Sequence, residues 1–251
     1  MLTFWTLWKR EIATYFHTAL GVTLFVLVLL LTGFNFYASV HLLNHGPTGI
    51  SIVEAFFNNL FFGGMLLVLA PLITMRLFAE EYKTGTIETL MTAPVRDTQV
   101  VLAKFLGAFF FFVLLWIPSL LYFILFWPSA HQVAAAGYGA YFGAYGMLLL
   151  QGAFYIAVGC MASSLTPHQL ISAILSLCLI TLFFFGGILL TCIPSAILTV
   201  RPFTEFFFPI ETMKNFSHGV IDTRSIVFYL SMTLLFLFLT LHIFQSRKWR
   251  R

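Results

Sequence analysis

A long uncharged run dominates this sequence. Between Phe105 and Val200 the chain has 96 residues without Asp, Glu, Lys or Arg, and Ile12 to Val53 adds another 42. A charge at the centre of a bilayer costs about 2.5–3.5 kcal/mol on insertion scales, whereas each Leu, Ile, Phe or Val returns only a few tenths. Uncharged runs of this length therefore indicate passage through a membrane.

The composition excludes a soluble globule, a disordered chain and a fibrous chain. Hydrophobic residues make up 60% of the 251 residues and charged residues only 9%, against about 25% charged in an average soluble domain. The net charge of +4 comes with no dense basic patch with interleaved aromatics, so we predict no nucleic-acid partner. The three cysteines fall within or at the end of apolar segments, which predicts neither a disulfide framework nor a metal site. The outer surface must instead meet membrane lipid.

Six stretches are long and apolar enough to cross about 30 Å of hydrocarbon at 1.5 Å per residue. We therefore predict an all-α integral membrane protein, with a single transmembrane domain over residues 1–251. The expected spans are 19–40, 56–75, 105–127, 138–162, 170–193 and 226–244.

The basic residues predict the orientation. An even number of spans puts both termini on one side, together with the loop 76–104. Ten of the 13 Lys and Arg residues lie on these segments, and only Arg201, Lys214 and Arg224 lie on the other side. By the positive-inside rule, both termini and this loop are expected in the cytoplasm, with the chain integral to the cytoplasmic (inner) membrane.

Residues 2–17 precede the first span and place Trp5, Trp8 and Ile12 on one helical face. This pattern suits a helix lying in the membrane interface. The alternative is an aromatic belt that only extends the first span.

The loop 76–104 holds eight of the 22 charges. A helix leaving the second span is expected to end at Gly85, Thr86 to cap a short helix, and Pro94 to stop it. The apolar face of that short helix comprises Ile87, Leu90 and Met91. We therefore predict an elbow against the inner membrane face, with a polar rim and an apolar anchor typical of a moderate protein interface. The alternative is an ordinary solvated loop.

The loop 194–225 is unusually apolar, because Phe203 to Phe208 is interrupted only by Thr204 and Glu205. Apolar residues in a loop need a surface to bury against. We expect short helices or a re-entrant hairpin that cap the spans on the outer side, followed by a turn with a helix stop at Gly219.

The fourth span carries Gly139 and Gly143, a GxxxG pair that permits close backbone approach. This pair either marks a helix–helix or subunit seam or reflects the general frequency of small residues in membrane helices. Uncharged polar residues inside the spans, such as Asn35 and Gln151, either line a path for an amphipathic cargo or form interhelical hydrogen bonds. Ser163 and Ser164 lie at a helix end, where capping explains them.

Catalytic and energising motifs are missing from the sequence. The six spans contain no interior Asp or Glu, which disfavours a proton- or sodium-coupled carrier. A P-loop needs Gly-x4-Gly-Lys-Ser/Thr, and the one Lys followed by Ser or Thr, Lys83, is preceded by Tyr82. We therefore predict no enzyme activity and no cofactor, metal or nucleotide bound by this chain.

Two segments resemble a known family. Glu80 to Leu90, followed by Pro94-Val95 and Lys104-Phe105, is similar to the cytoplasmic motif of type-2 ATP-binding-cassette (ABC) exporter permeases. Asn215 to Asp222, followed by Tyr229-Leu230 and the terminal Arg247-Lys248-Trp249-Arg250, resembles the gliding-motility-associated subgroup of those permeases. With the six-span layout, the resemblance covers nearly the whole chain.

The resemblance implies a permease subunit of an ATP-driven exporter. Such a subunit pairs with a second permease subunit, as a homodimer or heterodimer, and with two separate P-loop ATPase subunits that hold ATP and Mg. The loop elbow would be the coupling element that docks on the ATPase. The candidate coupling residues are Glu80, Glu81, Lys83, Gly85, Thr86, Ile87, Glu88, Leu90, Met91 and Pro94. The candidate outer gate or loop residues are Phe206, Phe207, Asn215, Phe216, Gly219 and Asp222, and the candidate helix-packing residues are Gly139 and Gly143.

Two other functions are compatible with the sequence. The first is a self-sufficient channel or secondary carrier, which needs no ATPase. The second is a membrane anchor of a motility or secretion machine, in which the spans transmit force rather than cargo.

Overall fold

The computed structural model describes residues 2–44, 49–87, 96–126, 137–191 and 209–249. These residues form helices and no strands. The helices are α1 (Leu2–His17), α2 (Ala19–Asn44), α3 (Ile52–Phe57), α4 (Leu60–Thr74), α5 (Ala79–Thr84), α7 (Asp97–Phe126), α8 (Tyr138–Leu165), α9 (Gln169–Thr191), α11 (Pro209–Ser217) and α12 (Thr223–Trp249).

Six segments of the described chain are long and apolar enough to cross a membrane. They are α2, α4 continued through α5, α7, α8, α9 and α12. This confirms the predicted all-α membrane protein with six transmembrane helices. The chain is a multi-pass membrane protein.

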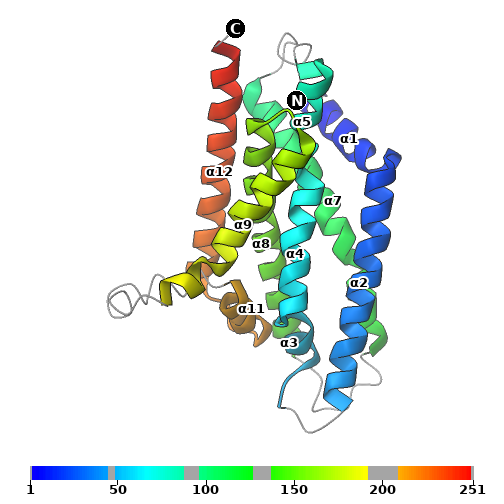
Figure 1. Ribbon diagram of the computed structural model, residues 1–251. Helices are drawn as coiled ribbons and strands as arrows, with labels where there is room; N and C mark the ends of the chain where they lie inside the picture. The colour runs from blue at the N-terminus through cyan, green and yellow to red at the C-terminus, as the bar shows by residue number, and fades with distance from the viewer. Residues whose placement is uncertain (1, 45–48, 88–95, 127–136, 192–208, 250–251) are drawn as a thin grey trace.

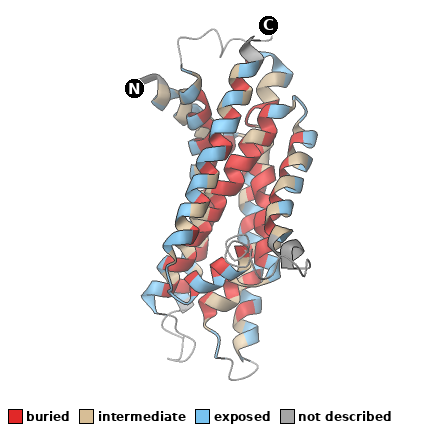
Figure 2. Ribbon diagram, turned by 90° about the vertical axis from the view of Figure 1, so that its left-hand side faces the viewer, coloured by how far each residue is buried: buried red, intermediate tan, exposed pale blue. Residues whose placement is uncertain are grey.

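Helix α8 lies at the centre of the bundle and packs against α4, α7, α9, α11 and α12. Along α8, fully buried side chains such as Met147, Phe154 and Tyr155 face neighbouring helices. Figure 2 shows that buried residues concentrate on the inward faces of the helices, while the outward faces are exposed. Those exposed faces are largely apolar, as lipid contact requires.

The expected span 56–75 is divided in the structure. Helix α3 ends at Phe57 with Asn58 as its C-cap. Helix α4 begins after Asn59, whose side chain accepts a hydrogen bond from the Phe62 N–H at 2.7 Å. Asn is a poor residue for a helix interior and a good N-cap, so a new helix starts there. The prediction of one continuous span from residue 56 was wrong for this reason. It rested on the apolar content of the stretch and did not consider the two adjacent asparagines as a helix boundary.

Side-chain amides within the bundle tie elements together, whereas most buried hydroxyls bond to a carbonyl of their own helix. The Asn35 amide of α2 donates to the Phe56 carbonyl of α3 at 3.0 Å, and Asn59 donates to the Asn35 side-chain oxygen at 2.6 Å. The Gln151 amide of α8 donates to the Pro209 carbonyl of α11 at 2.9 Å. For these residues the structure favours interhelical hydrogen bonds over a cargo-lining role.

The bundle has two differently built ends (Figure 1). One end carries α1, α5 and both chain termini, and we call it the elbow end. The other end carries α3 and α11, and we call it the α11 end. Helix α1 stops at His17 and α2 begins at Ala19, so α1 is a separate helix inclined to α2 and not an extension of the first span.

Candidate functional site

The structure describes the first part of the predicted elbow, and the name elbow is used from here on for the segment from Met75 to Ile87, which contains α5. Helix α4 stops at Thr74, a turn covers residues 75–78, and α5 follows. Gly85 then ends α5 with a φ of 74°, a left-handed conformation that glycine adopts without steric cost. This confirms the helix stop expected at Gly85.

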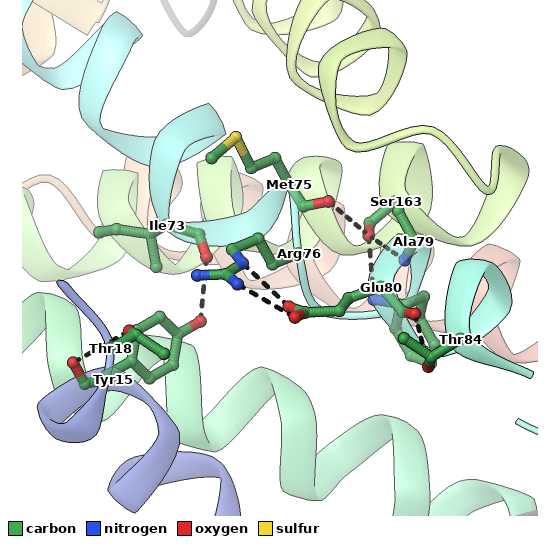
Figure 3. A network of polar contacts seen from close by, with 10 residues as sticks. Tyr15, Thr18, Ile73, Met75, Arg76, Ala79, Glu80, Thr84 and Ser163 are labelled. Atoms are coloured by element: carbon green, nitrogen blue, oxygen red, sulfur yellow. Dashed lines mark hydrogen bonds and ion pairs between the residues drawn. The ribbon is translucent and has the colours of Figure 1, made fainter. Parts of the chain in front are cut away.

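A side chain from another helix caps α5. The first residues of any helix have N–H groups without intrahelical partners, and Phe78, the N-cap residue of α5, has no side-chain oxygen to supply one. The Ser163 hydroxyl of α8 instead accepts from the Phe78 N–H at 3.0 Å and from the Ala79 N–H at 3.1 Å. Figure 3 shows this hydroxyl between the Met75 carbonyl and the Ala79 N–H of the elbow. Ser163 therefore caps α5, and not the end of its own helix as the sequence suggested.

An ion pair spans the turn within the elbow. The Arg76 guanidinium donates two hydrogen bonds to the Glu80 carboxylate, at 2.9 and 3.0 Å (Figure 3). The side chains are 29% and 38% exposed, so this i,i+4 pair contributes about 0.3–0.5 kcal/mol. Its fork geometry restrains α5 relative to the end of α4.

Lys104 joins three elements at this end. Its ammonium nitrogen lies 2.8 Å from a carboxylate oxygen of Glu81 on α5 and 3.0 Å from one of Glu11 on α1. It also lies 5.4 Å from the centre of the Phe78 ring. The Lys104 side chain is 4% exposed, so its charge depends on these two carboxylates for compensation. We call Glu11, Glu81 and Lys104 together the Lys104 triad.

The Lys104 triad combines two carboxylates with one ammonium group. The Oε2 atom of Glu81 is buried and has no hydrogen-bond partner among the described residues. A cavity of about 10 Å³, lined by Arg10 and the three triad residues among others, is the size of a single water molecule. The triad is thus held by charge compensation more than by complete hydrogen bonding.

Helix α1 is fixed to the elbow end by Tyr15. Its hydroxyl donates to the Ile73 carbonyl near the end of α4 at 3.0 Å (Figure 3), and its ring stacks on Phe111 of α7 at 4.6 Å. Burial raises the pKa of Tyr15 well above its usual value, with a smaller contribution from Glu11. The hydroxyl therefore stays protonated and remains a hydrogen-bond donor.

A cavity of about 280 Å³ lies between α1, the elbow and α7. Its lining mixes charged groups, including Arg10 and Arg76, with hydroxyls such as Thr14 and Thr86. The elbow is therefore held to its neighbours by polar contacts around this cavity as well as by buried apolar side chains such as Phe78.

The tip of the elbow is the stretch of residues 83–86. Lys83, Thr84, Gly85 and Thr86 are exposed, whereas Ile87 is 3% exposed and belongs to the core. Ile87 thus anchors the segment to its own chain. Among the other predicted coupling residues, Glu80 and Glu81 lie in the contacts above. Glu88, Leu90, Met91 and Pro94 lie outside the described residues.

The predicted outer-loop residues lie together at the α11 end. Asn215 is exposed and Phe216 buried on α11, Gly219 follows with a φ of 79°, and the Asp222 side chain accepts from the Arg224 N–H at the start of α12, at 2.9 Å. The expected short helix and the turn at Gly219 are present. Phe206 and Phe207 lie outside the described residues.

The two predicted packing glycines differ. A Cβ at Gly143 would collide with the backbone carbonyl of Phe216, so glycine at this position allows α11 to pack directly on α8. A Cβ at Gly139 would meet nothing within 4 Å. The close approach at Gly143 joins two elements of one chain.

Sequence reasoning missed the roles of Glu11, Tyr15 and Ser163 at the elbow end. Lys104 appeared only within the resemblance, although it carried a usable signal. It is the last charge before the 96-residue uncharged run, and a charge at the start of a membrane helix needs a partner. The identity of that partner depends on the tertiary fold.

The comparison with protein families identifies the chain. It matches the family described as ABC-2 family transporter protein over residues 11–249. The chain belongs to this family. A search of curated proteins finds no match. The ABC-2 membership makes the chain a permease component of an ABC transporter, a membrane component that associates with an ATPase subunit, and it accords with the resemblance seen at the elbow.

Proposed function

We propose that this ABC-2 chain is the permease subunit of an ATP-driven exporter, and that the elbow tip docks on the ATPase. The observation that carries this proposal is the construction of the elbow: an exposed tip on a segment fixed to α1, α7 and α8. A push on such a tip would reach several helices at once. The chain has no P-loop of its own, so hydrolysis is assigned to separate subunits that hold ATP and Mg.

The contacts suggest how ATPase closure would move the spans. A displacement of α5 would act on α8 through the hydrogen bonds to Ser163. It would act on α7 through the ion pair between Glu81 and Lys104. The Glu11–Lys104 and Tyr15–Ile73 contacts would carry the same displacement to α1. All of these are polar contacts that a displacement could break, and a switching element would need such contacts between its parts.

We also assign a second permease subunit to the transporter, with cargo passing between the two. The described interior of one chain is filled by large side chains such as Phe112, Phe154 and Tyr155, and its buried amides bond to backbone or to one another. A dense interior of this kind supports a path at the interface of two subunits rather than through one. The two permeases and two ATPases would form the complete transporter.

The proposed location is the cytoplasmic (inner) membrane, with the elbow end in the cytoplasm. Both described termini and the elbow share this end, and ten of the 13 Lys and Arg residues fall on these segments and the loop that continues the elbow. Membership of the gliding-motility-associated subgroup is proposed on the resemblance of the residues from Asn215 to Asp222.

Co-purification tests this proposal. The chain would be pulled down from its native membrane in detergent, and the ATPase activity of the eluate measured. We expect a P-loop subunit to co-purify, and Lys83→Glu or Glu88→Lys to reduce its recovery or its permease-dependent hydrolysis several-fold. Lys214→Glu, an equally exposed charge reversal at the α11 end, should change neither.

Two results would contradict the proposal. One is a chain that purifies without any ATPase and transports substrate by itself in liposomes, because this would indicate a channel or secondary carrier. The other is equal recovery and hydrolysis in Lys83→Glu, Glu88→Lys and wild type, because this would remove the elbow from the ATPase interface.

A further inference from the structure

A groove between α7 and α8 takes no part in the elbow or its contacts. Its volume is about 630 Å³, within the range of about 300–1,000 Å³ that proteins use for small ligands. The lining residues run from Val113 to Ile124 on α7 and from Tyr138 to Leu149 on α8. The groove therefore lies in the half of the bundle nearer the α11 end.

The length of the groove matches one leaflet of a bilayer. The first and last lining residues are eleven positions apart on each helix, which corresponds to a length of about 16 Å at 1.5 Å per residue. Half of a hydrocarbon core of about 30 Å has nearly the same length. The groove thus reaches from the membrane interface at the α11 end to about the middle of the bilayer.

The polarity of the groove changes along this length. The hydroxyl-bearing residues Tyr138 and Tyr141 stand at its α11 end, and Val113 and Leu149 mark its deep, apolar end. None of the described residues that line it is charged. Between the two ends, the Tyr145 hydroxyl bonds to Ser119 at 2.7 Å, so its polarity is already satisfied within the protein. A lipid has the same gradient, with ester groups at the interface and methylene groups below them.

The groove opens sideways towards the surface that faces lipid. Ile117, Ile124 and Phe142 line it and are 52%, 65% and 79% exposed. Trp116, at its floor, is 2% exposed. A molecule in the bilayer can therefore enter laterally, whereas one from water would have to pass the aromatic residues at the interface.

We propose that this groove binds one acyl chain of a diacyl membrane lipid in the leaflet at the α11 end. The chain lies along Leu120, Ile117 and Val113 in contact with Trp116, and its ester group lies level with Tyr138 and Tyr141. The lipid is a resident of the groove and exchanges more slowly than the lipid around the bundle. This site does not depend on the ATPase or on a second permease subunit.

Fluorescence quenching by brominated lipid tests the site. Trp5, Trp8, Trp127 and Trp249 are replaced by Phe in the full-length chain, which leaves Trp116 as the reporter. The chain is reconstituted into phosphatidylcholine vesicles with and without a phosphatidylcholine brominated at the middle of one acyl chain. Because Trp116 is shielded from bulk lipid, a bromine in contact with it must lie in the groove.

Two matched double variants separate the groove from bulk lipid. Ile117→Phe/Leu120→Phe fills the groove, and Leu121→Phe/Leu125→Phe makes the same change at exposed α7 positions outside it. We expect strong quenching in the parent and in the second variant, and at least a two-fold smaller effect in the first. Equal quenching in all three, or weak quenching in the parent, would overturn the proposal.

Two further measurements keep the test independent of the Trp replacements. With all tryptophans retained, mass spectrometry should find one fewer tightly held phospholipid on the filled variant than on its control after detergent washing. Equal lipid retention would count against the site. Cross-linking between copies through Phe142→Cys would place a second chain over the groove and would likewise overturn the lipid assignment.

Discussion

Lys104 holds one positive charge between two carboxylates from different helices, and little solvent reaches it. Its removal would leave Glu11 and Glu81 close together with no compensating charge. Loss of one partner from a buried ion pair typically costs about 3–5 kcal/mol. We predict that Lys104→Met lowers the thermal midpoint of the detergent-solubilised chain by many degrees. Lys83→Met, at the exposed tip, should leave it unchanged, and equal midpoints in the two variants would contradict a buried, paired Lys104.

Tyr15 predicts a pH dependence of stability. Its pKa is raised in the folded chain, whereas an unfolded tyrosine titrates near pH 10, so above that pH the unfolded state loses the proton first. The unfolding free energy therefore falls as pH rises past about 10, by up to about 1.4 kcal/mol per pH unit. Below pH 10, Tyr15→Phe should be less stable than wild type by about 1 kcal/mol because the bond to Ile73 is lost.

Unfolding of the two chains at pH 8 to 11.5 provides the measurement for Tyr15. The stability difference between wild type and Tyr15→Phe should shrink above pH 10, and other titrating groups cancel in this comparison. A difference that stays constant up to pH 11.5 would show that the Tyr15 hydroxyl is not buried.

At the residue scale, the sequence indicated which kinds of residue lie at the elbow but not which residues they contact. Charge density marked the elbow, and Gly85 marked its turn. The contacts of Glu11 with Lys104, and of Ser163 with α5, join positions 93 and about 85 residues apart. No local periodicity carries such information, because these contacts arise from helix packing.

Among the elements, α5 is a short helix that depends on α8 for its N-cap. Ser163→Ala would leave the N–H groups of Phe78 and Ala79 without an acceptor, at a cost of about 1–2 kcal/mol. We predict faster amide hydrogen exchange over residues 78–84. Ser164→Ala is the matched control, since Ser164 is equally buried but bonds to the Met161 carbonyl of its own helix. Similar exchange in both variants would show that the cap from α8 does not hold the elbow.

The contact of α8 with α11 depends on the glycine at position 143. Gly143→Ala would push a methyl group into the Phe216 backbone, which cannot rotate away, and overpacking of this kind costs about 1–3 kcal/mol. Gly146→Ala, with nothing within 4 Å, should be neutral or stabilise α8 by up to about 1 kcal/mol. Thermal unfolding of the two variants measures the difference. A Gly143→Ala chain as stable as Gly146→Ala would mean that α11 does not pack on α8 in this way.

The starts of three spans followed from the apolar content of the sequence. The first, fourth and fifth spans were expected to begin at residues 19, 138 and 170, and α2, α8 and α9 begin at Ala19, Tyr138 and Gln169. The prediction of the second span was wrong at Asn58 and Asn59, where one helix ends and another begins. The residues on both sides are apolar, so hydropathy alone did not indicate this boundary. Its correct division required the N-cap bond to Phe62.

Across the whole molecule, α8 connects the two ends of the bundle. Ser163 contacts the elbow at one end, and Gly143 and Gln151 contact α11 at the other. The stretch from Gly143 to Ser163 is part of one continuous helix, and it is about 30 Å long at 1.5 Å per residue. Helix α8 has no internal proline at which it would kink, so it can shift or tilt as one unit. A movement of the elbow would therefore also displace α11.

The arrangement of the two ends predicts opposite exposure across the membrane. The elbow end is expected in the cytoplasm because most of the basic residues lie there, and α11 is therefore expected outside. In a chain with its three cysteines replaced by alanine, Thr86→Cys and Lys214→Cys place single thiols on exposed positions at the two ends. In intact cells, a membrane-impermeant maleimide should label Lys214→Cys at once and Thr86→Cys only after lysis. The reverse pattern would invert the topology and with it the proposed docking of the elbow on a cytoplasmic ATPase, whereas the lipid groove between α7 and α8 would remain, in the opposite leaflet.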